Sequence, residues 1–424
     1  MPGHKGNFAP LLEAGLGRFD ITEVTGADVL FQSSGVLREL EERIAAFYGV
    51  FGTAVSTGGS TLCIQAMLAA AFRKGDRILA ARNAHTAFVN ACALLQLEPV
   101  WVCPAPLDHA RVGGALTPEQ ITLSLHEHPE VRGVYLTSPD YLGCLTDIAA
   151  IAEICHARGL LLVADNAHGA ALKLHDPDRH PMTLGADLCC DSAHKTLPVL
   201  TGGAFLHYSS RFDAEQIKAA MALFGSTSPS YLILRSVGLC MDWLESNGAA
   251  AYRETAAQIS RLKEYCASKG ICVPGGASDP LRLSVCMADF GMTDSAALTY
   301  FHSHQIEPEY IGGGYAVLMA SPFNRSVDWR RLEKALEELA AMPRSESAPV
   351  PLPFELPEAV MPPHEAVFAD SETVPLDSAV GKVAAQTVIT CPPGVPVVVP
   401  GEKITPQAEI ILKNSGNFVV KVVK

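Results

Sequence analysis

The sequence predicts an α/β protein with a mostly parallel β-sheet, a smaller α+β domain and a separate C-terminal domain. Between about residues 35 and 210, short continuous apolar segments alternate with helical patterns, which is typical of βα units with both faces of the sheet covered. Residues 246–342 then combine a long helical pattern with an apolar strand, and the Pro- and Ser-rich segment 343–353 reads as a linker. We therefore expect domains at 1–245, 246–342 and 354–424.

The elements of the predicted sheet follow one another at regular spacing. The expected strands are GTAVST (52–57), DRILAA (76–81), EPVWVCP (98–104), VRGVYLTS (131–138), GLLLVAD (159–165) and ADLCCDS (186–192). The expected helices include 60–75 and 147–159 between these strands, 211–245 with a polar interruption at STSPSY (226–231), and 249–270 before a strand at 281–288. Ligands bind at the carboxyl ends of the strands in such sheets, so chemistry is expected there.

Composition excludes several classes of function. The 424 residues carry 32 basic and 45 acidic side chains, a net charge of −13, which argues against a nucleic-acid partner. No apolar run reaches about 18 residues and the start, MPGHKGN, lacks a signal peptide's apolar core, so we expect a cytoplasmic protein without a membrane partner. The 12 cysteines are scattered and form no CxxC pair, which favours reduced thiols. The pairs HEH (126–128) and HSH (302–304) lack accompanying ligands, so no metal site is expected.

Polar side chains follow four of the expected strands. Ser60 and Thr61 in AVSTGGST suit a phosphate, although the same residues form ordinary helix caps. His85 follows the second strand, where a lone histidine is more often a cap than a catalyst. Asp165 ends a wholly apolar run and is either an N-cap or the partner of a cationic ring nitrogen.

The stretch DSAHKTLPVLTGGA (191–204) carries the remaining group, Lys195. A lysine is usually a solvated surface residue, but a desolvated one near the sheet edge becomes an amine nucleophile. Together, a lysine for an imine, an aspartate for a pyridinium nitrogen and a phosphate-binding loop match the needs of pyridoxal phosphate.

Nearly the whole chain resembles the bacterial-type Orn/Lys/Arg decarboxylases, which have the aspartate-aminotransferase-like fold of PLP-dependent transferases. The stretches that carry the resemblance are PGHKGN (2–7), FDITEVTGADVL (19–30), STGGST (56–61), ARNAHTA (81–87), LTSPDYLGCLTDI (136–148), ADNAHGA (164–170), DSAHKTLPVLTGGA (191–204), STSPSY (226–231) and CPPGVPVVVPGE (391–402). The resemblance implies a short family form and the decarboxylation of lysine, arginine or ornithine in polyamine metabolism.

The resemblance also implies roles for individual residues. Lys195 would form the imine with the cofactor, Asp165 would pair with the pyridine nitrogen, His85 would stack on the ring and Ala167 would line it. Lys195 or His194 would return a proton to the substrate's α-carbon. The residues expected to hold the phosphate are Ser60, Thr61, Ser192 and His194.

Other expected contacts lie farther along the chain. Ser226 or Thr227 would reach the phosphate across a dimer interface, so a homodimer or a higher homo-oligomer is expected. Glu309 and Glu402 are candidates for the distal cation of the basic amino acid, although either carboxylate can equally be structural.

The chain departs from the family pattern at several positions. It begins inside the PGHK motif, which a misassigned start codon or a truncation would explain, and it has Asn166, Cys391, Thr86 and Ala87 where the family has an acid, an aromatic residue, a lysine and a serine. These changes bear on substrate choice and assembly more than on the cofactor. Two alternatives to decarboxylation follow: another PLP reaction, such as transamination or aldol cleavage, or a non-catalytic regulatory homologue.

Overall fold

The computed structural model describes residues 21, 23–104, 114–345, 355–389, 396–414 and 416–424. Their main feature is a seven-stranded sheet of order β1-β7-β6-β5-β4-β2-β3, in which β7 is antiparallel to both of its neighbours and the other strands run parallel to one another. The strands are β1 (Gly52–Ser56), β2 (Arg77–Ala81), β3 (Glu98–Val102), β4 (Gly133–Thr137), β5 (Leu161–Asp165), β6 (Leu188–Asp191) and β7 (Ala204–Tyr208). The six predicted strands are confirmed, whereas the sequence analysis did not anticipate β7.

Helices cover both faces of this sheet because successive strand residues point to opposite sides. Ile78 packs with α3 (Gly59–Ala71), α4 (Thr86–Leu95) and α8 (Ala214–Ala222) on one face. Its neighbour Leu79 packs with α5 (Pro118–Glu127) and α6 (Ile148–His156) on the other.

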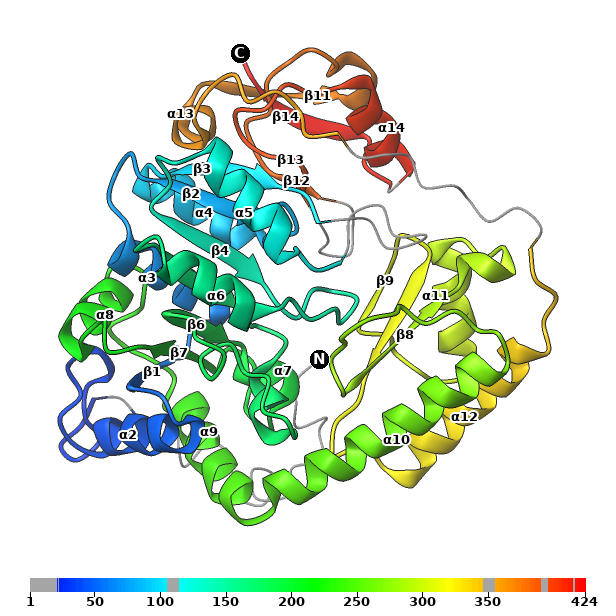
Figure 1. The fold of residues 1–424 in the computed structure, drawn as a ribbon, viewed down its shortest axis with the longest axis horizontal. Coiled ribbons are helices and arrows are strands. Elements are labelled where there is room, and N and C mark those ends of the chain that lie inside the picture. The colour runs from blue at the N-terminus through cyan, green and yellow to red at the C-terminus, as the bar shows by residue number, and fades with distance from the viewer. Residues whose placement is uncertain (1–20, 22, 105–113, 346–354, 390–395, 415) are drawn as a thin grey trace.

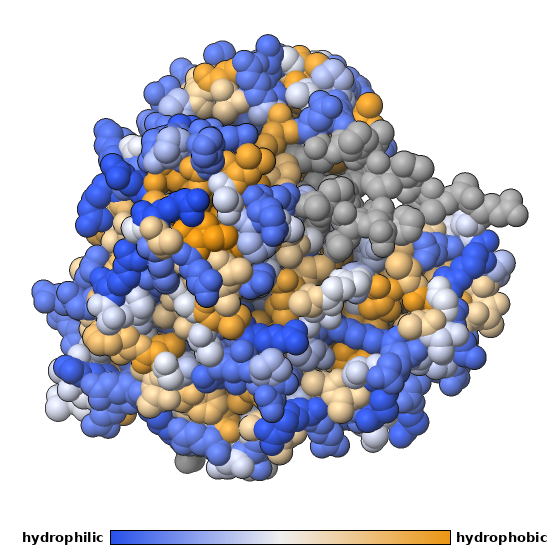
Figure 2. Space-filling model, in the orientation of Figure 1, coloured by the Kyte–Doolittle hydropathy of each residue, from blue (hydrophilic) through white to orange (hydrophobic). Residues whose placement is uncertain are grey.

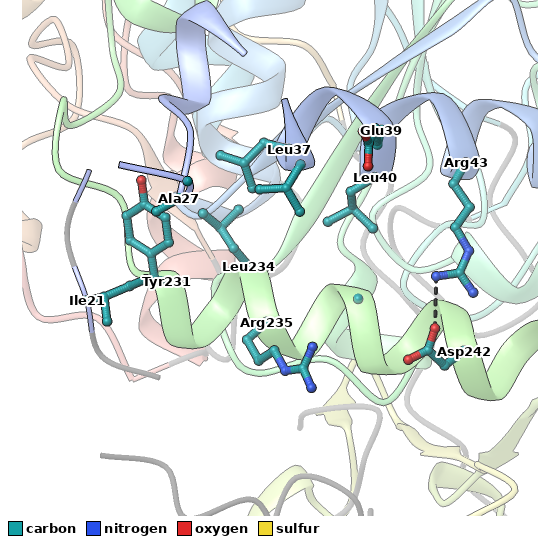
Figure 3. A pocket seen from close by; sticks show the side chains of 13 residues that line it. Ile21, Ala27, Leu37, Glu39, Leu40, Arg43, Tyr231, Leu234, Arg235 and Asp242 are labelled. Atoms are coloured by element: carbon teal, nitrogen blue, oxygen red, sulfur yellow. Dashed lines mark hydrogen bonds and ion pairs between the residues drawn. The ribbon is translucent and has the colours of Figure 1, made fainter. Parts of the chain in front are cut away.

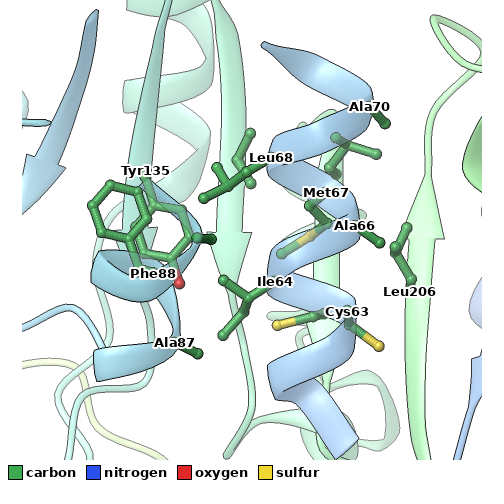
Figure 4. Packing of buried hydrophobic residues seen from close by; sticks show 14 of the residues in the cluster. Cys63, Ile64, Ala66, Met67, Leu68, Ala70, Ala87, Phe88, Tyr135 and Leu206 are labelled. Atoms are coloured by element: carbon green, nitrogen blue, oxygen red, sulfur yellow. The ribbon is translucent and has the colours of Figure 1, made fainter. Parts of the chain in front are cut away.

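The side chains of α3 form the centre of the core. Ile64 and Leu68 of this helix are fully buried and face the rings of Phe88 and Tyr135, whose centroids lie 4.2 Å apart (Figure 4). Burial of each large apolar side chain contributes roughly 1.5–3 kcal/mol. The packing therefore fixes the starts of α3 and α4, where the phosphate-loop serine and His85 lie.

A second unit follows the sheet. It contains α10 (Ala249–Ser268), β8 (Arg282–Cys286), α11 (Asp294–Ser303), β9 (Tyr310–Gly312), β10 (Tyr315–Met319) and α12 (Ser326–Ala340). Its antiparallel sheet has the order β8-β10-β9 and its own apolar core. In Figure 1, β8 and β9 face the end of the large sheet where α7 lies.

The last unit packs beside the β3 edge of the large sheet (Figure 1). It contains α13 (Pro363–Phe368), β11 (Ser371–Pro375), β12 (Val388–Ile389), β13 (Pro396–Val398), α14 (Pro406–Asn414) and β14 (Val419–Val423). These elements share a third core, which includes Val398, Leu412 and Val422. The motif at 2–7, the linker residues 346–353 and Cys391 lie outside the described residues.

The large unit also contains the helices α2 (Val36–Tyr48) and α9 (Tyr231–Trp243). Helix α2 packs against β1, the edge strand opposite β3. A groove of about 450 Å³ runs between α2 and α9, lined by apolar side chains such as Leu40 and Leu234, and the Arg43–Asp242 hydrogen bond of 2.9 Å crosses it (Figure 3). Figure 2 shows hydrophilic side chains over much of one face of the molecule, with apolar ones gathered in smaller areas. None of the helices in the described ranges has the length and apolar character needed to cross a bilayer.

Candidate active site

Lys195 lies on α7 (Ala193–Thr196), a single helical turn that directly follows β6. Its Nζ is 2.8 Å from Nε2 of His168, in the loop after β5. Burial lowers the pKa of the Lys195 ammonium and Arg282 lowers it further, whereas Glu309 and Asp165 oppose this shift. A larger fraction of Lys195 is therefore in the neutral, nucleophilic amine form than is the case for an ordinary surface lysine.

Asp165 is the last residue of β5 and is 1% exposed. Its carboxylate accepts hydrogen bonds from the Tyr135 hydroxyl (3.2 Å), the Ala167 backbone amide (3.1 Å) and the Cys190 thiol (3.5 Å). Tyr135 lies on β4 and Cys190 on β6, so the two neighbouring strands hold the carboxylate from both sides. These neutral donors fix the orientation of the carboxylate without a cationic partner, which leaves its charge to act on a bound group.

Two histidines lie near Lys195 and Asp165. His85 is the N-cap of α4, and its Nδ1 accepts a hydrogen bond of 3.1 Å from the Ala87 amide. Burial lowers the pKa of His85, with Asp165 raising it and Lys195 lowering it. Burial and then the charge of Lys195 hold the pKa of His168 well below its usual value. Both imidazoles are therefore neutral near pH 7.

The expected phosphate-binding residues come from two adjacent loops. Ser60 and Thr61 are half-buried and exposed, respectively, in the first turn of α3, which no side chain caps. The amide of Gly59 donates to Gly202 O (2.8 Å), so this turn is tied to the loop that follows α7. An uncapped helix start with small residues around it is an anion site of the kind that a phosphate group uses.

The second loop places Ser192 and His194 together. The Ser192 hydroxyl lies 3.3 Å from His194 Nδ1, which is also 3.1 Å from Gly203 O, and burial lowers the pKa of His194. The sequence thus identified two loops that the structure brings side by side. Ser226 and Thr227 are exposed in the loop before α9.

The two predicted substrate carboxylates have different surroundings. Glu309 is half-buried just before β9, and its charge acts on both Lys195 and His194. Glu402 forms instead a two-pronged ion pair with Arg82 at 2.6 and 2.7 Å and accepts from the Val399 amide (2.9 Å). Both partners are buried, at 2% and 0% exposed, so the prediction that Glu402 contacts the substrate is corrected to a structural role.

Sequence reasoning missed three groups around Lys195 and Asp165. His168 lies within the ADNAHGA motif, and its proximity to Lys195 arises only from tertiary structure, across 27 residues. Tyr135 could have been found, because it lies on the strand beside β5, two residues before that strand ends at Thr137. Tyr141 packs edge-to-face against His168 with 5.6 Å between ring centroids, and burial raises the pKa of the Tyr141 hydroxyl.

A buried cluster beneath the site was also missed. The carboxylate of Asp191 lies within hydrogen-bonding distance of Asn166 (2.6 Å), His180 (3.0 Å) and His207 (3.2 Å). Within the described ranges, His180, Asp191 and His207 are the group whose ligand atoms lie close enough together to bind a metal ion. The other ring nitrogens already have partners, the Met182 amide and the Thr53 hydroxyl. The Met182 amide donates to Nδ1 of His180, so the proton of that ring lies on Nε2, toward Asp191. Hydrogen bonds thus already join both histidines to Asp191 in this cluster.

Pyridoxal phosphate requires an amine, an anion for its ring nitrogen and a cradle for its phosphate. The described residues supply the amine of Lys195, the carboxylate of Asp165 and the uncapped start of α3. Nδ1 of His168 is buried without a hydrogen-bond partner among the described residues, which leaves one further polar contact for a bound group. The residues therefore fit this cofactor.

The comparisons with known proteins agree with this geometry. Residues 8–273 match the model of the Orn/Lys/Arg decarboxylase major domain, and residues 352–414 match that of the C-terminal domain. The chain belongs to the Orn/Lys/Arg decarboxylase family. Arginine decarboxylases of Halalkalibacterium halodurans and Bacillus subtilis are 28% and 27% identical over 96% and 98% of this chain, covering 87% and 89% of their own lengths.

Solved structures share the same fold. The lysine decarboxylase of Francisella novicida matches with a TM-score of 0.79 and 18% identity, over 100% of this chain and 78% of its own. Lysine decarboxylase A of Pseudomonas aeruginosa matches with a TM-score of 0.80 over the same shares of the two chains. As a family member with this fold, the protein is a PLP-dependent amino-acid decarboxylase, a carboxy-lyase acting on basic amino acids.

Proposed function

We propose that this protein decarboxylates arginine to agmatine, with lysine and ornithine as the alternative substrates. The observation that carries the proposal is the contact between Lys195 and His168 beside the buried carboxylate of Asp165. Arginine is placed first because arginine decarboxylases match nearly the whole chain. The product would be a precursor for polyamine synthesis.

The residues of the site divide the chemistry among them. Pyridoxal phosphate, when bound, supplies the electron sink that accepts the pair released as CO2 leaves. Asp165 favours the protonated ring nitrogen, because a carboxylate in a dry site stabilises the opposite charge strongly. When the cofactor is bound, His85 would stack on its ring and Ala167, which is 9% exposed, would line it.

Lys195 would hold the cofactor through its amine and would supply the proton that the substrate's α-carbon takes up after CO2 has left. Its low pKa provides the neutral amine that bond formation requires. His168, 2.8 Å away and neutral, accepts or shares the proton that Lys195 exchanges. His194 is the alternative proton donor, but its Nδ1 is already engaged by Ser192 and Gly203, so we place Lys195 first.

The distal cation of the substrate needs an anionic partner. We assign this role to Glu309, because its carboxylate comes from the second unit and its charge acts on Lys195 across the space between the units. Glu402 does not compete for this role, since Arg82 occupies both of its oxygens.

We further propose a homodimer as the working unit, with Ser226 or Thr227 completing the phosphate site of the partner subunit. Both side chains are exposed in a single chain, as a contribution to a partner requires. Sedimentation velocity of the purified protein would show a dimer, and a monomer with full activity would contradict the proposal.

The test of function is CO2 release by the purified, cofactor-loaded protein with arginine, lysine and ornithine, alongside a Lys195→Ala variant. We expect turnover of arginine and its loss in the variant. Amino-group transfer to a keto acid without CO2 would instead identify a different PLP reaction, and no bound cofactor would favour a regulatory homologue.

A further inference from the structure

A cavity of about 550 Å³ lies between the large unit and α10, and none of the proposed active-site residues lines it. One wall is the loop at 175–179, the second is one face of α10 from Arg253 to Lys263, and the third is Ser278 with Pro280. The residues of α10 that line the cavity recur every three or four positions, so they form a single stripe along the helix.

The lining is strongly basic. Among the described residues that line it are Arg179, Arg253 and Lys263 but a single carboxylate, Asp176, on a chain whose net charge is −13. The nearby carboxylate of Asp279 does not line the cavity and pairs with Arg282 at 3.3 Å, although its charge also acts on Lys263 and His175. The cavity thus concentrates positive charge where the rest of the protein has an excess of negative charge.

Several polar groups in this cavity lack protein partners. Within the described ranges, neither the Arg179 nor the Arg253 guanidinium has a hydrogen bond or ion pair with another side chain. Nε2 of His175 is buried without a hydrogen-bond partner there. Lys263 donates to Ser278 Oγ (3.0 Å) and Asp279 O (3.3 Å), which leaves one of its three N–H groups for a ligand. Burial lowers the pKa of Lys263, a cost that an anion beside it would offset.

The spacing of the cations limits the shape of the ligand. Arg253 and Lys263 are ten residues apart on one helix, which corresponds to about 15 Å at 1.5 Å per residue. A molecule with several anionic groups spaced along the helix can contact both ends without either side chain having to turn toward the other. Guanidinium forks match phosphate oxygens in geometry as well as charge.

We propose that this cavity binds an elongated small molecule bearing at least two phosphate-type anionic groups. Backbone hydrogen bonds join the third wall of the cavity to the segment at 143–145. The Asp279 amide donates to Gly143 O (2.7 Å), and the Leu145 amide donates to Ala277 O (2.9 Å). Tyr141 lies two residues before this contacted segment and packs edge-to-face against His168. An occupant of the cavity would therefore lie against the support of the residues around Lys195.

The test is isothermal titration of the cofactor-loaded protein with inorganic tripolyphosphate and, separately, inorganic phosphate. Loading with pyridoxal phosphate keeps the loop near Ser192 occupied by the cofactor's own phosphate. The test variant is Arg179→Gln/Arg253→Gln, and the matched control is Arg330→Gln, an exposed arginine on α12 outside the cavity.

We expect saturable tripolyphosphate binding by the wild type and the control, weaker binding of phosphate, and a loss of affinity of roughly tenfold or more in the double variant. Absence of saturable tripolyphosphate binding would overturn the proposal. If the double variant bound tripolyphosphate as tightly as the wild type, the anion would bind at another part of the protein and the proposal would be wrong. If inorganic phosphate bound as tightly as tripolyphosphate, an elongated ligand would be excluded. The CO2 assay is independent of these outcomes, so failure of this site and failure of the proposed function are distinguishable.

Discussion

The buried ion pair between Arg82 and Glu402 joins residues 320 positions apart and links the C-terminal unit to the end of β2. Besides the two bonds to the carboxylate, the Arg82 guanidinium donates to Pro396 O (3.1 Å) and Val397 O (3.2 Å) and lies 4.9 Å from the ring of Trp101. Replacing Glu402 with Met removes the carboxylate that binds this buried guanidinium through both of its oxygens. We therefore expect a loss of about 3–5 kcal/mol in the free energy of unfolding.

The corresponding shift in melting temperature follows from chain length. An unfolding entropy of about 2.1 cal/mol/K per residue over this chain amounts to roughly 0.9 kcal/mol/K, so the midpoint should fall by about 3–6 °C if the protein unfolds as one unit. Differential scanning calorimetry would measure this fall. A separate, earlier transition would show instead that the C-terminal unit has come apart from the sheet.

A double-mutant cycle tests the reasoning itself. Arg82→Met should cost about as much as Glu402→Met, whereas the double variant should lose much less than the sum, because neither charge is then left unpaired. Lys382→Met is the matched control, since Lys382 and Glu372 form an exposed pair of 2.9 Å in the same unit and should contribute less than about 1 kcal/mol. Additive losses in the cycle would refute the coupling.

Three further predictions concern the site and its support. Asp165→Asn should lower kcat for CO2 release by roughly 1000-fold, or about 4 kcal/mol of activation free energy, and an unchanged kcat would contradict its role. Attachment of the cofactor to the apoprotein can be followed by absorbance as a function of pH. In Glu309→Gln the pH of half-maximal rate should fall, because the Glu309 carboxylate raises the pKa of Lys195. A shift of this midpoint to higher pH would be incompatible with that contact. Asn166→Asp places a second buried carboxyl group beside Asp191, whose own pKa is held low by His180 and His207 despite burial. The new group's pKa should rise, so the variant should lose more thermal stability at pH 8 than at pH 5, and equal losses would argue against the contact.

Much of the fold could be predicted because its strands are short, apolar and separated by helices of regular length. β7 was missed because AFLHY (204–208) follows a Gly pair and is antiparallel to its neighbours, so it lacks the preceding helix that marks the other strands. The loops carrying Ser192 and Ser60 were found from strand ends alone, since the parallel strands bring those ends to one edge.

The rest of the site depends on contacts that no local pattern encodes. His168 belongs to a motif that the sequence displays, yet its contact with Lys195 depends on how the loop after β5 folds back. For Glu402 the sequence left substrate contact and structural carboxylate both open, because its partner Arg82 is remote in the sequence and close only in space. A charged residue in a family motif can thus stabilise the junction of two units instead of contacting the ligand.

The central claim is that Lys195 is the residue that bonds to the cofactor, and borohydride reduction tests it most directly. The protein loaded with pyridoxal phosphate would be reduced, digested and examined by mass spectrometry. We predict that the pyridoxyl group is found on the peptide containing Lys195 and that the Lys195→Ala variant takes up none. A reduced adduct on a different lysine, or undiminished labelling of the variant, would contradict the account.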